Sequence, residues 1–593
     1  MANFMNKQTM KKYKVNPINI KGFNKLTAGL LMCILLLVIA PFYTKLNITG
    51  IGGLALPYNI PQWMISSWII AFSLLIIVQS KKLYIPKNYY YFIAFPLVVV
   101  VSGLLTDVGD PITWLFRLLY IIGGFLFLFS LFQFQLKQRA IDRVLLLFSI
   151  ATGFHACIGL YQNIFPGEGF AWFLASHDGE PRGIFQQINV HASYLVTGMI
   201  VTLYLSSRPF LRNSSILLKA SMILSFGLSN YIVIYSGSRI ALLSLLIALV
   251  LVLFSRKKQL LLQKPMMIML FLVFVATSFL GQEGFNRTLE KTVQLTESEY
   301  SSIRLSMYAI GSDLVKEEPL HGHGIGSFLR VWHVQAAEFY ELHPDAAFAE
   351  YVGHPHNEIL FWLIEGGIIA ASGIILFIIG LTVALYQCGF QRGASYAAIL
   401  LPVGFHAQVE MPFYTSSVHW FLWLFLVYIL LRHQQRQVSI TLSGSAVKLL
   451  QVLAVLFVVI TSYFMYHTDR AQTDLYNYLY NKDVKPPYLQ IAYRNLYFRS
   501  LADKVAMRSL LIESIKNDDY QIAATYLPWA DRYLQIRPEP EIFGDVADLN
   551  DFMYQNKNEV ACGLVRQGFR MYPSINVLKD GVESCSLNEA SSD

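Results

Sequence analysis

Long apolar segments, separated by short polar connections, recur along most of the chain. A helix needs about 20 apolar residues to cross a bilayer. About thirteen segments approach this length, which predicts an all-α polytopic membrane protein with about 13 transmembrane helices. The candidate spans are residues 26–44, 63–80, 89–106, 113–133, 144–165, 190–207, 219–236, 239–255, 264–281, 364–387, 394–410, 418–432 and 446–466.

Lysine and arginine residues gather in every second connection between these spans. Cationic connections face the cytoplasm in most membrane proteins. The alternation therefore predicts a cytoplasmic N-terminus and, for an odd number of spans, an external C-terminus. The cationic residues are Lys81, Lys82 and Lys87, then Lys137, Arg139 and Arg143, then Arg208, Arg212 and Lys219, then Arg256, Lys257, Lys258 and Lys264, then Arg392, and finally Arg432 and Arg436.

The apolar and polar segments predict five parts of the chain. The last of them lacks an apolar run long enough to span, and its leucine and methionine spacing predicts a small helical domain on the periplasmic side. The parts are a basic cytoplasmic N-terminus (1–25), transmembrane helices 1–9 (26–281), a large periplasmic loop (282–356), transmembrane helices 10–13 (357–466) and a periplasmic helical domain (467–593).

Composition agrees with a membrane protein. Hydrophobic residues make up 55% of the chain, charged residues only 14%, and the mean hydropathy is +0.45. Soluble proteins carry about 25% charged residues, so an ordinary soluble protein is excluded. The net charge of +8 follows the topology pattern, and no nucleic-acid partner is expected. Cys562 and Cys585 can form a disulfide in an oxidising periplasm or remain two buried thiols.

Two arginines on the expected external face are candidates for binding phosphate. Arg239 ends the sequence Ser-Gly-Ser-Arg in a turn between two spans, where an arginine can also simply anchor a helix. Arg304 lies in the large loop, where it can equally be a surface residue. The guanidinium group is planar, permanently charged and well matched to phosphate oxygens.

The sequence His-Pro-His-Asn, residues 354–357, opens the apolar run that contains Glu365. Two histidines with this spacing can suggest a metal site, but no third ligand is singled out by its spacing. A histidine at the boundary between water and membrane is better suited to proton transfer. A carboxylate inside an apolar segment indicates either a functional group or a structural ion pair. His354, His356, Asn357 and Glu365 are therefore candidate site residues.

Two more polar groups flank spans on the same face. Residues 181–191 combine an arginine with three amide side chains, although they can also form an ordinary interfacial loop. Residues 406–412 combine a histidine with a glutamate at the end of a span. The glycine-rich segment 319–326 lacks the Lys-Ser/Thr of a phosphate-binding loop, so no nucleotide is expected. The candidate supporting residues are Arg182, Gln187, Asn189, His406 and Glu410.

In their order and sidedness, these motifs resemble the O-antigen ligase superfamily. The resemblance covers about residues 220–430: Ser-Gly-Ser-Arg at a turn, Arg304 four residues before an aromatic ring, a Pro-Leu-x-Gly-x-Gly-x-Gly stretch, and His-Asn-x-x-Leu before Glu-Gly-Gly. Residues 182–195 are similar to a signature of the bacterial protein O-oligosaccharyltransferases that glycosylate pilins. Here Val190 stands where that signature has histidine, and His191 follows one residue later.

The resemblance implies a GT-C-like enzyme of the bacterial inner membrane that uses an undecaprenyl-diphosphate-linked glycan as donor. It also implies inverting transfer without a metal or other cofactor. Arg239 and Arg304 would bind the diphosphate, because the leaving group needs positive charge where negative charge develops. His356 would be the catalytic base that takes the proton of the acceptor hydroxyl, with Asn357 orienting its ring.

Three functions remain open at this stage. The first is transfer to a hydroxyl, by analogy a serine, of a pilin-like periplasmic protein. The second is ligation to the lipid A core, or glycan polymerisation. The third is a lipid-linked glycan flippase, but a transporter places charges at mid-membrane depth, whereas here they collect at one face. The region 467–593 favours a protein acceptor, which needs a docking surface.

Overall fold

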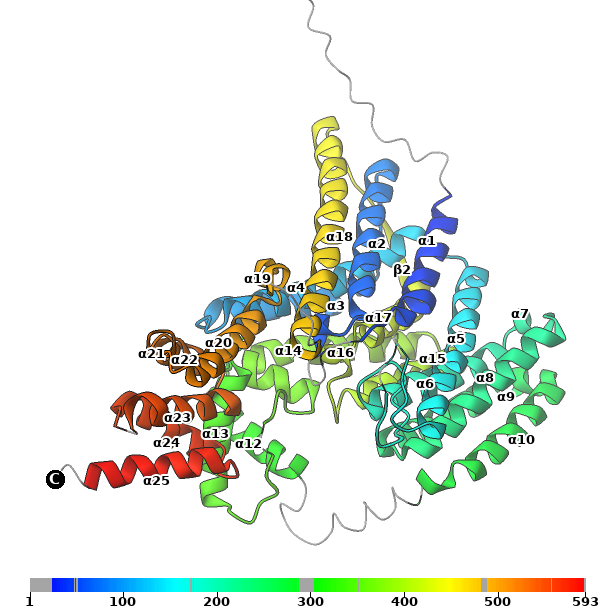
Figure 1. Cartoon of the computed structure of the whole chain (residues 1–593). Coiled ribbons are helices and arrows are strands. Elements are labelled where there is room, and N and C mark those ends of the chain that lie inside the picture. Colours follow the sequence, from blue (N-terminus) through cyan, green and yellow to red (C-terminus); the bar gives the residue numbers. More distant parts are fainter. Residues whose placement is uncertain are drawn as a thin grey trace, which may run out of the picture.

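The computed structural model describes residues 24–46, 48, 52–170, 173, 175–284, 286, 303–349, 351–481, 488–555 and 557–590. Almost all regular structure in this part of the chain is helical (Figure 1). The fold is that of an all-α polytopic membrane protein, as predicted. Most of the basic N-terminal segment lies outside the described residues, as does much of the predicted loop before Ile303.

Each of the thirteen predicted spans overlaps a helix. By length and composition, nine stretches of the described residues can cross a membrane, one of which joins α9 to α10, whereas α3, α15 and α17 are shorter. The number of spans therefore stays a prediction. The helices are α1 (Lys25–Ile34, extended by η2 Leu35–Ile39 and η3 Ala40–Phe42), α2 (Asn59–Ser80), α3 (Tyr89–Leu105), α4 (Pro111–Leu131), α5 (Gln138–Ile164), α6 (Ile188–Ser206), α8 (Ile216–Ser236), α9 (Arg239–Leu260), α10 (Lys264–Leu280), α14 (Glu358–Gln387), α15 (Phe390–His406), α17 (Ser417–Leu431) and α18 (Gly444–Tyr480).

Two helices form the centre of the bundle. In α6 every residue from Val190 to Ser206 is buried, and in α17 every residue except Trp423 is buried. Small and hydroxyl-bearing residues let α6 approach its neighbours closely, as is typical of membrane helices. Thr202 of α6, for example, forms a hydrogen bond with Ser149 of α5 (2.6 Å). Such contacts pack α6 closely against its neighbours in the centre of the bundle.

Helix α14 is broken at Gly367, whose φ of 62° is accessible to glycine without strain. The glycine-rich segment 319–326 supplies hydrogen-bond partners for the broken backbone. The Gly324 N–H donates to the Glu365 carbonyl (3.0 Å), and similar bonds lie on either side of it. A Cβ added to Gly322 would lie 2.6 Å from the Glu365 backbone, so only glycine fits there. This backbone clasp between residues 319–324 and 364–369 fixes the outer half of α14.

The connections that carry the predicted cytoplasmic charges lie together at one end of the helices. Strand β1 (Lys82–Pro86) pairs antiparallel with β2 (Gln435–Ser439), with Lys82 opposite Ser439. Arg432 donates to the carbonyl of Leu136 (2.8 Å), which brings in a third such connection. The other ends of these helices carry the candidate site. This separation of the connections agrees with the predicted alternation.

The helices after α18 pack against the large loop. Their core includes Phe543 and Val565 and reaches Ala337 of α13. Ion pairs link Arg537 to Asp110 at the start of α4 (2.7 Å) and Arg570 to Glu341 (2.6 Å). Figure 1 shows these helices beside α12 and α13. The loop helices are α12 (Ile303–Glu317) and α13 (Phe328–Leu342). The helices after α18 are α19 (Gln490–Arg494), α20 (Arg499–Lys516), α21 (Tyr520–Ala523), α22 (Tyr526–Leu534), α23 (Pro540–Tyr554), α24 (Glu559–Met571) and α25 (Asn576–Ala590).

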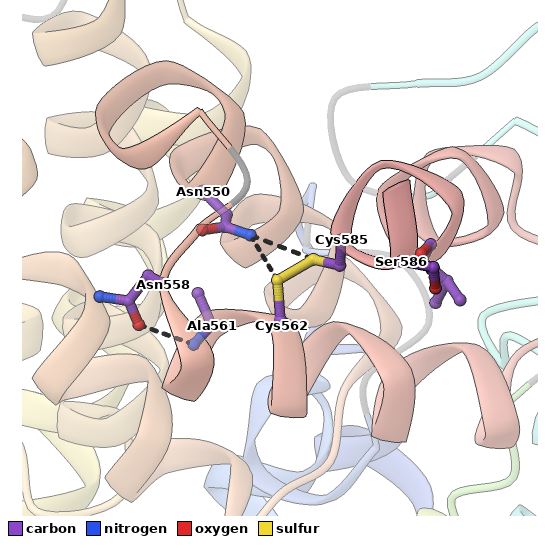
Figure 2. Close-up of a disulfide and its surroundings, with 7 residues drawn as sticks. Asn550, Asn558, Ala561, Cys562, Cys585 and Ser586 are labelled. Atoms are coloured by element: carbon purple, nitrogen blue, oxygen red, sulfur yellow. Dashed lines mark hydrogen bonds between the residues drawn. A yellow bond between two sulfur atoms is a disulfide. The ribbon is translucent and has the colours of Figure 1, made fainter. Parts of the chain in front are cut away.

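Cys562 of α24 and Cys585 of α25 form a disulfide, which settles the alternative left open by the sequence. Figure 2 shows the Asn550 side chain directed at both sulfur atoms, at 3.2 and 3.4 Å. Structural disulfides are typical of oxidising compartments such as the periplasm. The bond therefore supports the prediction that these helices lie outside the cytoplasm.

Sidedness can be tested by cysteine labelling in a variant whose free cysteines, Cys33, Cys157 and Cys388, are replaced by alanine. Arg532→Cys on α22 and Lys258→Cys at the end of α9 are both at exposed positions. An impermeant maleimide applied to intact spheroplasts should label residue 532, and residue 258 only after the membrane is opened. Labelling of residue 258 in intact spheroplasts would invert the topology.

Candidate active site

A cavity of about 1990 Å³ opens at the end of the bundle that carries the large loop and the C-terminal helices. Its lining is apolar along the membrane helices, where Leu126 and Ile378 are exposed, whereas the end next to the C-terminal helices carries charged and polar side chains. The apolar residues come from membrane helices and include Phe95, Phe125, Leu126, Phe377, Ile378 and Leu381. The polar residues include Arg117, Arg182, Gln187, His354, His356 and Glu358. The cavity thus suits a molecule with an apolar tail and a charged head.

Two of the predicted residues, His354 and His356, face each other in this cavity, with ring centroids 4.4 Å apart. His356 has a φ of 52°, a left-handed conformation that non-glycine residues adopt rarely and that is often found at functional sites. The segment is pinned by Asn357, which caps α14 by accepting from the Leu360 N–H (2.9 Å) and donates to the Gln408 carbonyl (2.9 Å).

Burial keeps both histidines neutral. It lowers the pKa of His354 to about 3, helped by the neighbouring His356. Burial also lowers the pKa of His356, which the Glu410 carboxylate raises and the Arg304 charge lowers further. The Nδ1 atoms of both rings are buried without a hydrogen-bond partner among the described residues. A neutral imidazole beside a cavity can accept a proton, as a general base must.

Glu410 joins three other predicted residues into one cluster. Its carboxylate accepts hydrogen bonds from Asn189 and from Arg304 (3.3 Å), and it pairs with His406 (2.9 Å). Burial raises the pKa of Glu410, but its interactions with His406, Asn189 and His356 together lower that pKa below the usual range. The other ring nitrogen of His406 meets Ser193 Oγ (2.8 Å). The cluster lies beside His356 and holds Arg304 in place.

Glu365 is paired with Arg117 of α4 (2.7 Å). The sequence predicted Glu365 but not this partner. The presence of Arg117 inside the predicted span 113–133 could have identified it as a candidate site residue, because charges within spans are rare and usually functional. The Arg117 guanidinium lies over the rings of Phe361 (4.1 Å) and Tyr414 (5.2 Å).

Other predicted residues are placed differently. Arg182 lines the cavity but pairs with Asp178 (2.5 Å) and Glu180 (2.9 Å). Gln187 lines the cavity and precedes α6 as its N-cap residue. His191, beside the position where the signature has its histidine, is buried, and its Nδ1 lies 2.7 Å from the Pro181 carbonyl oxygen.

Arg239 begins α9 and is exposed, and it is not among the described residues that line the cavity. Its predicted contact with a diphosphate stays a prediction. As for metals, no group of three or more His, Cys, Asp or Glu side chains within the described ranges is arranged to hold an ion.

Two family models match the chain. Residues 220–378 match the model described as O-antigen ligase, and residues 395–573 match the model described as virulence factor membrane-bound polymerase, C-terminal. Together they cover more than half of the chain. Arg304, His354, His356 and Glu365 lie in the first match, and Glu410 lies in the second. No curated protein matches the chain.

The pKa of His356 sets an expectation for pH dependence. For a transfer reaction in which the neutral His356 ring acts as base, the lowered pKa predicts a rate that stays constant from neutral pH to below pH 6.5, the ordinary histidine value. The rate should fall only as the pH drops through the lowered pKa. Glu410→Gln removes a charge that raises this pKa, so the falling limb should move to lower pH while the maximal rate decreases.

Glu318→Gln, at an exposed position of the large loop, is the matched control and should leave the pH profile unchanged. The measurement is the initial transfer rate between pH 4.5 and 8, a range chosen to bracket the histidine value. If the falling limb of the Glu410→Gln profile moves to higher pH or does not move, the Glu410 charge does not raise the pKa of the group that titrates.

Proposed function

Because the chain carries an O-antigen ligase domain, we propose that it transfers a glycan from undecaprenyl diphosphate to a hydroxyl, by analogy a serine, of a periplasmic protein such as a pilin. The family is one of membrane enzymes that transfer glycosyl groups, so the proposal concerns the donor, the acceptor and the residues. One observation carries it: a neutral His356 lines the polar end of a cavity that is apolar along the membrane helices, and the paired charges of Arg304 and Glu410 are close enough to shift the pKa of this histidine.

The proposed reaction is a single displacement. His356 takes the proton of the acceptor hydroxyl, the hydroxyl oxygen bonds to the anomeric carbon, and the bond from that carbon to the diphosphate oxygen breaks. The electron pair leaves with the lipid diphosphate, and the anomeric configuration is inverted. Arg304 would stabilise the leaving diphosphate, since a guanidinium donates two parallel hydrogen bonds to phosphate oxygens. The side chain of Arg304 is 38% exposed and can therefore reach a ligand.

The donor fits the two parts of the cavity. A polyprenyl chain is apolar and belongs in the part lined by Phe95, Phe125 and Phe377. The diphosphate and the sugar are polar and belong near the histidines. Neither Arg304 nor Arg239 is among the described residues that line the cavity; Arg304 acts electrostatically on His356, and Arg239 remains a second proposed diphosphate ligand. We place all of this on the periplasmic side of the inner membrane, in keeping with the disulfide and the charge pattern.

The position of the C-terminal helices indicates the kind of acceptor. Tyr497, Lys504, Tyr533 and Glu541 from this region line the outer part of the cavity. An acceptor bound by these helices would therefore lie next to the reacting groups, which favours a protein as acceptor. The match to a virulence factor polymerase region favours a second candidate, in which the acceptor hydroxyl belongs to a growing glycan.

The chemical assignment predicts a graded series of variants. His356→Ala should lower the transfer rate about 10²–10⁴-fold, as loss of a general base usually does. Arg304→Ala should also lower the rate, and Arg304→Lys should restore it only in part, because an ammonium cannot form the bidentate contact. His354→Ala should have a smaller effect, and chelation should have none.

The measurement is transfer from purified lipid donor in liposomes, with each variant checked for expression and for elution as one species. His343→Ala, at an exposed position of the large loop, is the matched histidine control. Full activity of His356→Ala would exclude it as the base. Loss of activity on chelation that a divalent ion restores would favour a metal-assisted reaction.

The acceptor can be identified by direct competition. The purified chain is given lipid-linked glycan together with a pilin-like protein, lipid A core and free glycan, and each product is followed by intact mass. We expect the protein to gain the mass of the glycan. Product found only on the lipid A core would identify a ligase, and product found only on glycan would identify a polymerase.

A further inference from the structure

Arg117 is a charged side chain of the cavity wall that the proposed chemistry does not use. It lies on α4 and lines the cavity, and its Nη1 donates to Glu365 Oε2 (2.7 Å). Its Nε is buried and has no hydrogen-bond partner in the described part of the chain. The side chain as a whole is nevertheless 11% exposed and lies on the cavity wall, so the part of the guanidinium that Glu365 does not bind can donate to a ligand there.

Stacking fixes the plane of this guanidinium. Phe361 lies 4.1 Å from its central carbon and Tyr414 lies 5.2 Å from it, both measured to the ring centroid. The Tyr414 ring is in turn 6.1 Å from the ring of His354. Arg117 therefore lies beside the histidine pair, with its plane fixed by the aromatic rings.

The charge of Arg117 is not fully used by Glu365. The same carboxylate also accepts the N–H of Phe328 (3.2 Å), the first residue of α13. The positive end of a helix already stabilises an anion placed there. Glu365 is therefore stabilised by this helix end as well as by Arg117, and only one nitrogen of Arg117 donates to it.

We propose that Arg117 binds one phosphate of the donor diphosphate, as a second cation beside the histidines in addition to Arg304, and that Glu365 is the residue that positions it. This inference rests on the proposed function, because it assumes a diphosphate in the cavity. The two arginines come from different elements, α4 and α12, so each can meet a different phosphate. A guanidinium that donates from one nitrogen to Glu365 can still donate from its other nitrogens to phosphate oxygens.

The test measures binding of geranylgeranyl diphosphate and of geranylgeranyl monophosphate to the full-length protein in detergent. Arg117→Gln alone leaves Glu365 buried without its partner and can fail to fold. The decisive variant is therefore the double substitution Arg117→Gln with Glu365→Gln, which removes both charges together. It should elute as the wild type does and bind the diphosphate about 10- to 100-fold more weakly, the range expected for lost charge-assisted hydrogen bonds.

Two further variants sharpen the result. Arg117→Lys should recover only part of the affinity. Glu365→Gln alone should raise the apparent KM for the lipid donor more than it lowers kcat, because it disturbs the binding cation and leaves the base intact. Arg139→Gln, an exposed arginine at the other end of the bundle, is the control and should bind like the wild type.

The outcomes separate the two proposals. If the wild type binds no prenyl diphosphate, the proposed donor is wrong. If the wild type binds it and the double variant binds it equally well, Arg117 is only the structural partner of Glu365 and this inference fails. Competition by inorganic diphosphate shows whether the site recognises the head group alone, and equal affinity for the monophosphate would contradict a contact to a second phosphate.

Discussion

The backbone clasp between residues 319–324 and 364–369 is the constraint on which the site depends. A helix broken at membrane depth exposes backbone groups that lipid cannot satisfy. The glycine-rich segment satisfies them and allows α14 to change direction at Gly367. The outer half of α14 thereby carries Glu365 to a buried position against Arg117, which lines the cavity, and starts beside His356. The two glycine motifs are thus the two sides of one set of backbone hydrogen bonds.

Buried carboxylates organise the cations of this site. Glu365 holds Arg117, and Glu410 holds Arg304 while also contacting His406. Removing one partner of a buried pair usually costs about 3–5 kcal/mol, because the other charge remains unpaired. A lipid diphosphate in the cavity would meet Arg117 on its wall and Arg304 next to His356, each already paired with a carboxylate. Little side-chain ordering is then left to occur on binding, which favours rapid chemistry.

The sequence predicted the helices well and the partners of the site less well. Hydropathy depends on about 20 consecutive residues, so each predicted span could be placed without knowledge of its neighbours. The order of the motifs along the chain also identified His356, Arg304 and Glu410, which the structure brings together. Arg117 was missed because its partner, Glu365, is 248 residues away, and no local pattern connects the two. Nor could spacing place Arg239 relative to the cavity, because that depends on how α9 packs.

Helix α18 is continuous from Gly444 to Tyr480, so it leaves the apolar layer and enters the C-terminal region without a joint (Figure 1). Each residue of an α-helix advances it by about 1.5 Å and turns it by about 100°. Adding or removing one residue after the apolar stretch would swing the C-terminal helices around this axis and carry Arg537 away from Asp110. Exposed positions of this helix can therefore vary, whereas its length sets the angle at which the C-terminal helices meet the membrane helices, where Asp469 pairs with Lys45 and Asp474 accepts from the Ile491 N–H.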